Sequence, residues 1–149
     1  MVLDVSHIND KGFWDVIELS DGHPVIASHS NARALSSHMR NLSDDMIKAL
    51  AKTGGVMGMN RLDAFISEDP EKQSVEGLAD HVDYIRDLAG IDHIGCGFDF
   101  EDYVEQDALS KNGAPNDNPE STTGLVSAAD AQNFLRALEN RGYTLSLIH

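Results

Sequence analysis

The chain has 149 residues, and its 11 Lys and Arg against 25 Asp and Glu give a formal charge of −14 at pH 7. This length is typical of a single domain, and an apolar content of 41% is sufficient for a hydrophobic core. The acidic balance argues against binding to nucleic acid or to an anionic membrane surface, since both require clustered Lys and Arg. No apolar run approaches the ~20 residues that span a bilayer, and residues 1–10 do not have the pattern of a signal peptide. The sequence therefore predicts a cytoplasmic protein with no nucleic-acid or membrane partner.

Four short apolar runs rich in Val, Ile and Gly have the character of β-strands. They are residues 2–6, 24–28, 55–59 and 93–98. Such near-continuous apolar runs are typical of parallel strands that are buried on both faces. Cys96, the only cysteine, lies in the fourth run, where we expect a small buried residue; it can form no internal disulfide.

The segments between these runs have helical patterns. Ser43 is a predicted N-cap, because two acidic residues follow it in the first turn. The alternation of strands and helices predicts a parallel α/β fold in one unit over residues 1–149. Residues 101–127 are polar and rich in Asn, Pro and Gly, which indicates a long loop. The predicted helices cover residues 13–19, 44–51, 78–89 and 128–142.

Polar side chains directly follow the predicted strands. His7 follows the first, His29 the second, Asn60 the third and Asp99 the fourth. Because the carboxyl ends of parallel strands meet at one edge, where ligands usually bind, we expect these side chains to lie together. Imidazole nitrogen and carboxylate oxygen are the usual zinc ligands, and a hydrolytic metal site needs both. The alternative is that the two histidines are only packed or hydrogen-bonded residues.

Arg40 is a second candidate for function, since it stands between the second predicted strand and the helix that Ser43 begins. A guanidinium can hold a substrate carboxylate with two parallel hydrogen bonds. The alternative is an ion pair with Asp44 or Asp45, which follow it closely in the sequence.

A more specific pattern runs through segments spread over about a hundred residues. It comprises residues 4–7, 24–33, 40–45, 54–60, 81–85, 89–95 and 97–100, among them Asp4-Val5-Ser6-His7, Ser28-His29-Ser30-Asn31 and Gly97-Phe98-Asp99-Phe100. In this order the segments resemble the renal, or membrane, dipeptidase family of zinc metallopeptidases. The resemblance implies a (β/α)₈ barrel of the TIM type that holds two zinc ions at the carboxyl ends of its strands.

The resemblance also implies roles for particular residues. His7 and His29 match the two histidines that hold one of the zinc ions, and Arg40 matches the arginine that binds the carboxylate end of a dipeptide. Asp99 matches the aspartate that engages the free amino end of the substrate and takes part in proton transfer. The implied reaction is hydrolysis of a dipeptide, with tolerance of a D-residue at the carboxyl end.

Other features of the family are missing from the sequence. The family holds its other zinc with a His-x-Asp pair and bridges both ions with a glutamate, and no His-x-Asp occurs in this chain. We therefore expect the carboxyl-terminal half of a barrel, about four βα units, that binds at most one zinc and has little activity alone. Open strand edges would favour a homo-oligomer or a partner chain that covers them.

Two other functions compete with a dipeptidase. One is a catalytically inactive binding or assembly module of the same fold, which the missing ligands favour. The other is an unrelated acidic α/β domain that binds a phosphorylated ligand. The sequence argues against this alternative, because no glycine-rich phosphate loop follows a predicted strand.

Overall fold

The computed structural model describes residues 1–100 and 122–144, so most of the predicted loop 101–127 lies outside the described residues. The described strands are β1 (Leu3–Asp4), β2 (Val25–Ile26), β3 (Met57–Met59) and β4 (Ile94–Cys96). The main helices are α1 (Asp10–Leu19), α2 (Asp44–Lys52), α4 (Val75–Ala89) and α6 (Ala131–Asn140). The shorter helical segments are α3 (Asp63–Ile66), η1 (Pro70–Lys72), η2 (Ile91–His93) and η3 (Ala128–Asp130).

The strands pair in parallel, as the sequence predicts. β1 pairs with β2, and β3 pairs with β4. A parallel bridge between Ala27 and Met57 joins β2 to β3, so the four strands follow one another in chain order. The carboxyl ends of all four strands consequently lie along the same edge of this parallel arrangement.

Burial on both faces, which the apolar runs predict, is found only for β3 among the described strands. All three residues of β3 are buried, whereas both residues of β1 are exposed. Cys96 at the end of β4 is exposed as well, so the prediction that it is buried is wrong. The physical reason is position: β1 and β4 are the outer strands of the described set and pair on one side only.

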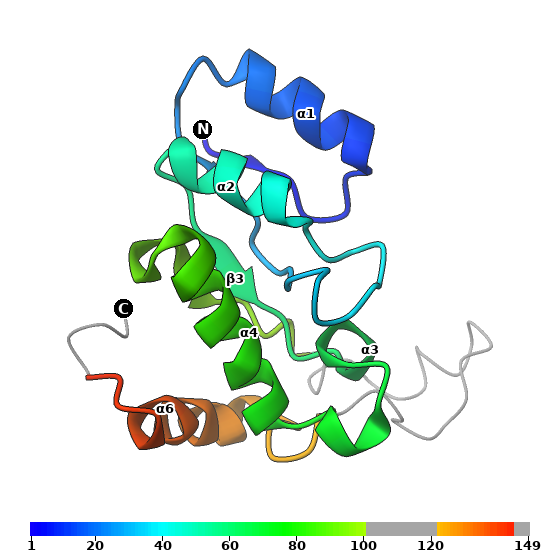
Figure 1. Cartoon of the computed structure of the whole chain (residues 1–149), viewed down its shortest axis with the longest axis vertical. Helices are drawn as coiled ribbons and strands as arrows, with labels where there is room; N and C mark the ends of the chain where they lie inside the picture. Colours follow the sequence, from blue (N-terminus) through cyan, green and yellow to red (C-terminus); the bar gives the residue numbers. More distant parts are fainter. Residues whose placement is uncertain (101–121, 145–149) are drawn as a thin grey trace.

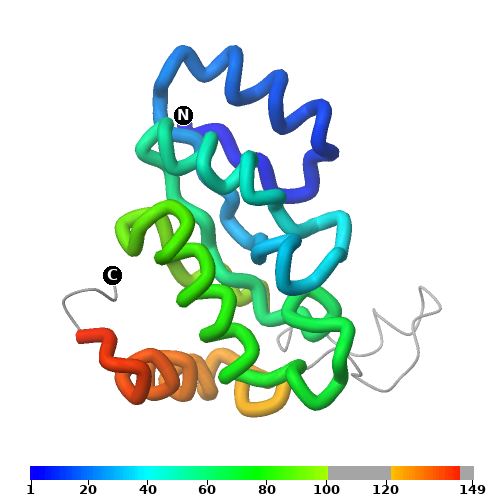
Figure 2. The backbone as a smooth tube through the Cα atoms, in the orientation of Figure 1, coloured from blue at the N-terminus to red at the C-terminus, as the bar shows by residue number. Residues whose placement is uncertain are grey.

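The helices lie side by side in chain order, with α1 at one end of the molecule and α6 at the other (Figures 1 and 2). Adjacent helices α1 and α2, α2 and α4, and α4 and α6 are in contact. The predicted cap is confirmed, because the Ser43 side chain accepts a hydrogen bond from the backbone N–H of Met46. Helix α4 ends at Gly90, whose φ of 105° is a conformation that favours glycine.

The hydrophobic core lies between the strands and helices α2, α4 and α6. Leu50 of α2, Ile85 of α4 and Phe134 of α6 are each at most 2% exposed and belong to one cluster with Val25 and Met59 of the strands. Burial of this apolar surface holds the helices on the sheet and so fixes the edge where the strands end. No described helix is long and apolar enough to cross a membrane.

Candidate metal centre

His7 and His29 meet at the carboxyl ends of β1 and β2. Their Nε2 atoms are 2.8 Å apart, and the rings stand edge to face with centroids separated by 4.8 Å. His7 reaches this position with a φ of 72°, an uncommon conformation for a non-glycine residue. Partial desolvation, together with the positive charge of Arg40, lowers the pKa of His7. The neutral imidazole that a metal requires is therefore favoured at His7.

Asp99 approaches the same pair from the end of β4. One of its carboxylate oxygens lies 4.0 Å from Nε2 of His29, and its φ of 60° is also left-handed. Backbone strain of this kind is concentrated at functional sites. The structure thus brings together three of the four strand-end residues that the sequence singles out, His7, His29 and Asp99, although they come from opposite ends of the strand order.

Arg40 carries buried guanidinium atoms that have no hydrogen-bond partner among the described residues. These atoms are Nε and Nη2, and the Cζ atom of Arg40 lies 5.3 Å from the centre of the Phe65 ring. Burial lowers the pKa of Arg40, while the negative charges of Asp99 and Asp4 oppose this effect. Two buried donors without partners cost free energy, and a carboxylate ligand would satisfy both.

The alternative ion pair of Arg40 with Asp44 or Asp45 does not form in the described part of the chain. The carboxylate of Asp44 instead accepts a hydrogen bond from the Tyr84 hydroxyl at 2.8 Å. Arg40 instead interacts electrostatically with His7, Asp99 and Asp4 at the strand ends.

Three buried asparagines behind the site were not singled out together by the sequence. The side chain of Asn31 donates to the backbone carbonyl oxygen of Asn60 and accepts from its backbone N–H, which ties the loop after β2 to the end of β3. Asn41 donates to the carbonyl oxygens of Ser36 and Phe65. The network fixes the loop that carries Arg40, since Asn41 is its neighbour. Asn60 follows a fully apolar strand, and this was the one signal that could have marked the network.

The described residues offer an incomplete set of zinc ligands. The two imidazole nitrogens converge, but no group of three His, Cys, Asp or Glu side chains with metal-binding geometry occurs within residues 1–100 and 122–144. A catalytic zinc usually has three protein ligands. The described residues therefore fit one zinc held by His7 and His29, with further ligands required from water or from other protein groups.

Known proteins resemble this chain in sequence and in fold. Dipeptidase tcpJ of Claviceps purpurea (strain 20.1) is 32% identical over 142 residues, which cover 95% of this chain and 30% of that protein. A metallopeptidase from Rhodobacter sphaeroides, solved with a phosphinate mimic of the dipeptide L-Ala-D-Ala, superimposes with a TM-score of 0.77 at 33% identity over 97% of this chain and 37% of that one. An amidohydrolase from Pseudomonas aeruginosa gives a TM-score of 0.81 at 25% identity over 99% of this chain and 47% of that one.

This chain thus spans between 30% and 47% of the length of these three relatives. The sequence pattern of the family described as membrane dipeptidase, peptidase family M19, matches residues 1–149. The chain therefore belongs to the membrane dipeptidase family.

Proposed function

We propose that this chain contributes one zinc-binding side of a metallodipeptidase site, with His7 and His29 as the protein ligands. The observation that carries the proposal is the convergence of the two Nε2 atoms at 2.8 Å. This spacing is shorter than the ~3.3 Å expected between two ligands of one tetrahedral zinc, so a small rotation of the rings would admit the ion. Bound zinc would polarise the scissile carbonyl and lower the pKa of the attacking water.

Arg40 and Asp99 have complementary roles in this proposal. The buried Nε and Nη2 atoms of Arg40 would bind the carboxylate end of a dipeptide, which supplies the two acceptors that these donors lack. Asp99 would hold the free amino end and move a proton, from a position 4.0 Å from His29. The binding of a mimic of L-Ala-D-Ala by the Rhodobacter sphaeroides relative supports a dipeptide with a D-residue at its carboxyl end.

The proposal also includes a half-barrel architecture, in which the described parallel strands form one part of a (β/α)₈ barrel. The outer strands β1 and β4 each pair on one side only in the described residues. Val2, which precedes β1, and Leu3, its first residue, are 62% and 38% exposed. Because an open apolar edge favours pairing, we propose a homo-oligomer or a partner chain at these edges. Such an assembly could also supply the missing zinc ligands.

The first experiment combines a zinc titration with hydrolysis of a dipeptide panel that includes L-Ala-D-Ala. The proposal expects zinc to raise the unfolding temperature of the full chain, and expects His7→Ala and His29→Ala to abolish this effect. His23→Ala is the matched control, since His23 is exposed in a turn away from the strand ends.

Two results separate the parts of the proposal. Zinc stabilisation without hydrolysis would support the metal site and show that the chain alone lacks catalytic groups. Zinc stabilisation that persists in both histidine variants would contradict the metal site. Light scattering over a range of protein concentrations tests the assembly, and a monomer at all concentrations would contradict it.

A further inference from the structure

Three side chains form a hydrogen-bonded series behind the metal-facing side of His29. The Oγ atom of Ser28 lies 2.5 Å from the Oδ2 atom of Asp4 and 2.7 Å from the Nδ1 atom of His29. Asp4 is the last residue of β1, and Ser28 follows β2, so the series crosses from one strand end to the next. The Nε2 atom of His29, on the opposite side of the ring, faces His7.

Asp4 is held as a carboxylate. Its Oδ1 atom accepts hydrogen bonds from the backbone N–H groups of Ser6 and Ser28, both at 3.0 Å. Burial of the side chain acts to raise the pKa of Asp4, but the hydrogen bonds from the Ser28 side chain and from these two backbone groups outweigh it and lower the pKa. An ionised carboxylate can only accept hydrogen bonds.

The charge on Asp4 sets the direction of every hydrogen bond in the series. The Ser28 hydroxyl must donate its only proton to Asp4, because two acceptor oxygens 2.5 Å apart would repel each other. Ser28 can then meet His29 only as an acceptor, so the proton of the His29 ring is on Nδ1. A neutral imidazole with its proton on Nδ1 has no proton on Nε2.

We propose that Asp4, acting through Ser28, is a positioning residue that holds His29 in its Nδ1–H tautomer and keeps Nε2 free to bind a metal. The inference rests on the proposed zinc site for its functional meaning, but the tautomer itself exists without the metal. The tautomer of His29 also determines the tautomer of His7. The Nε2 atom of His7 lies 2.8 Å from the unprotonated Nε2 atom of His29, so it must carry a proton and donate it. The two histidines are therefore opposite tautomers in the metal-free protein.

Asp4→Asn makes a sharp test, because it should reverse the series. The two backbone N–H groups hold the amide oxygen of the new side chain, which turns its NH₂ group towards Ser28. The Ser28 hydroxyl then accepts from the amide and donates to Nδ1 of His29, so the ring proton moves to Nε2 and weakens metal binding. Ser28→Ala merely removes the partner of Nδ1 and leaves both tautomers accessible.

The experiment uses the full chain labelled with ¹⁵N-histidine at pH 8, without zinc. Two-bond ¹H–¹⁵N correlation spectra identify the protonated nitrogen of each ring. We expect Nδ1–H at His29 and Nε2–H at His7 in the wild-type chain, Nε2–H at His29 in Asp4→Asn, and a mixture at His29 in Ser28→Ala. His7→Gln and His29→Gln assign the signals. Asp15→Asn, which removes the same charge on the exposed face of α1, should leave both tautomers unchanged.

Zinc affinity, measured by competition with a chromophoric chelator, provides the second readout. Loss of a partner that orients a metal-binding histidine typically costs 10–100-fold in affinity. We expect a loss of about 100-fold for Asp4→Asn, about 10-fold for Ser28→Ala and none for Asp15→Asn. If Asp4 only held the two strand ends together, Asp4→Asn would leave the His29 tautomer unchanged and would not produce this order of zinc affinities.

The outcomes are distinguishable. A proton on Nε2 of His29 in the wild-type chain, or an unchanged His29 tautomer in Asp4→Asn, would overturn the inference. Zinc affinity that is equal in Asp4→Asn and Asp15→Asn would overturn it as well. If the wild-type chain shows the expected tautomers but binds no zinc, the positioning role is supported and the proposed zinc site is the part that fails.

Discussion

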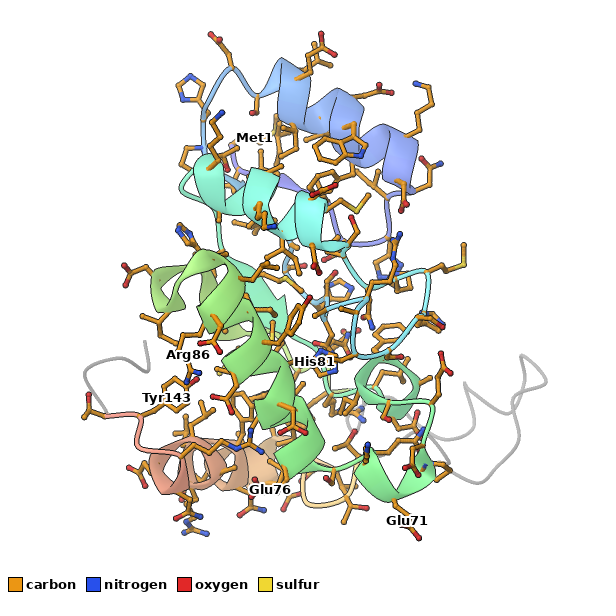
Figure 3. The ribbon with its side chains drawn as sticks, in the orientation of Figure 1. Met1, Glu71, Glu76, His81, Arg86 and Tyr143 are labelled. Carbon is orange, nitrogen blue, oxygen red and sulfur yellow. The ribbon has the colours of Figure 1, made fainter. Side chains whose placement is uncertain are left out.

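The Nδ1 atom of His81 accepts a hydrogen bond of 3.1 Å from the backbone N–H of Ala32, three residues after His29. The other ring nitrogen, Nε2, lies 2.8 Å from the carbonyl oxygen of Ile66 and donates to it. His81 is completely buried on α4, in the interior of the molecule (Figure 3). This histidine therefore ties the loop that carries His29 to the helix layer, and the bond that it accepts from Ala32 requires the neutral ring.

The neutral state of His81 makes the stability of the chain depend on pH. Burial lowers the pKa of His81 below its ordinary value of 6.5, against smaller opposing effects of Ile66 and Asp80. The unfolded chain thus binds more protons than the folded chain just below pH 6.5, and the free energy of unfolding falls as the pH decreases through this window. The loss ends below the lowered folded-state pKa. Urea unfolding between pH 8 and pH 4.5 measures it.

His81→Gln should reduce this pH dependence, because glutamine can accept from Ala32 and donate to Ile66 without titrating. His7, whose pKa is also lowered, contributes to the slope that remains. His23→Gln, in an exposed turn, is the control and should keep the full slope. An equal slope in His81→Gln and the wild-type chain would contradict the account.

Arg40→Met is expected to stabilise the fold while it removes carboxylate binding. Within residues 1–100 and 122–144, the buried Nε and Nη2 atoms of Arg40 have no hydrogen-bond partners, and methionine has a similar shape with no donors to desolvate. We expect an increase of about 1 kcal/mol in the free energy of unfolding, measured with urea. Arg33→Met provides the opposite case, because Arg33 forms a two-bonded ion pair with Asp10 and its loss should destabilise. A destabilised Arg40→Met chain would contradict the prediction.

The close approach of β3 and β4 to the loop of His29 depends on glycine. A Cβ atom added at Gly58 or at Gly97 would collide with the backbone carbonyl oxygen of Ser28, which cannot move away independently. We expect Gly58→Ala to lower the free energy of unfolding by about 2–3 kcal/mol and to weaken zinc binding, since it displaces the neighbour of His29.

Gly95→Ala is the matched control for Gly58→Ala. Its added Cβ would meet only the side chain of Val56, at 3.1 Å, and a side chain can yield. Its expected effect is less than about 1 kcal/mol. Equal losses of stability in the two variants, measured by urea unfolding, would show that the contact with Ser28 is not the limiting one.

Arg141 links the end of α6 to α4 through several acidic groups. Its Nη1 atom lies 2.8 Å from Asp80 and 2.7 Å from Asp83, and its Nη2 atom donates to the backbone and side chain of Glu76. The side chain of Arg141 is only 22% exposed, so water screens these bonds less than it screens fully exposed ones. We expect Arg141→Gln to cost about 1–2 kcal/mol in urea unfolding, and less at high salt.

Lys11→Gln serves as the comparison for Arg141→Gln. Lys11 pairs with Asp15 on the exposed face of α1, where the two side chains are 84% and 55% exposed. Such pairs contribute less than about 0.5 kcal/mol. Arg86 and Tyr143 extend the cluster of Arg141 across the same boundary, where Figure 3 shows them together. A loss for Arg141→Gln no larger than that for Lys11→Gln would contradict a stabilising cluster.

The sequence predicted those features that depend on local pattern. The parallel strands, the Ser43 cap and the end of α4 at Gly90 follow from apolar runs, a capping residue and a glycine. The meeting of His7 and His29 follows from their common place at strand ends. Each of these predictions uses only residues that are close in sequence or a rule that applies to any parallel sheet.

Features that depend on distant partners could not be predicted in this way. The role of His81 requires Ala32 and Ile66, which are 49 and 15 positions away, and nothing in the sequence near His81 indicates them. The same is true of Asp4 and Ser28, 24 positions apart. The exposure of Cys96 depends on which strands lie beside β4 rather than on its apolar neighbours.

A backbone bridge between β2 and β3 joins the two strand pairs that carry the site. Hydrogen bonds from Ala27 to Val56, from Gly58 to Ala27 and from Ser30 to Gly58 join the strand pair that carries the histidines to the pair that carries Asp99. A fluctuation that opens these bonds would part the histidines from Asp99 while each strand pair stays intact. The amide protons of Ala27 and Gly58 should therefore exchange with deuterium faster than those within the β3–β4 pair. Zinc should leave this difference in place, because both proposed zinc ligands lie on the same side of the bridge.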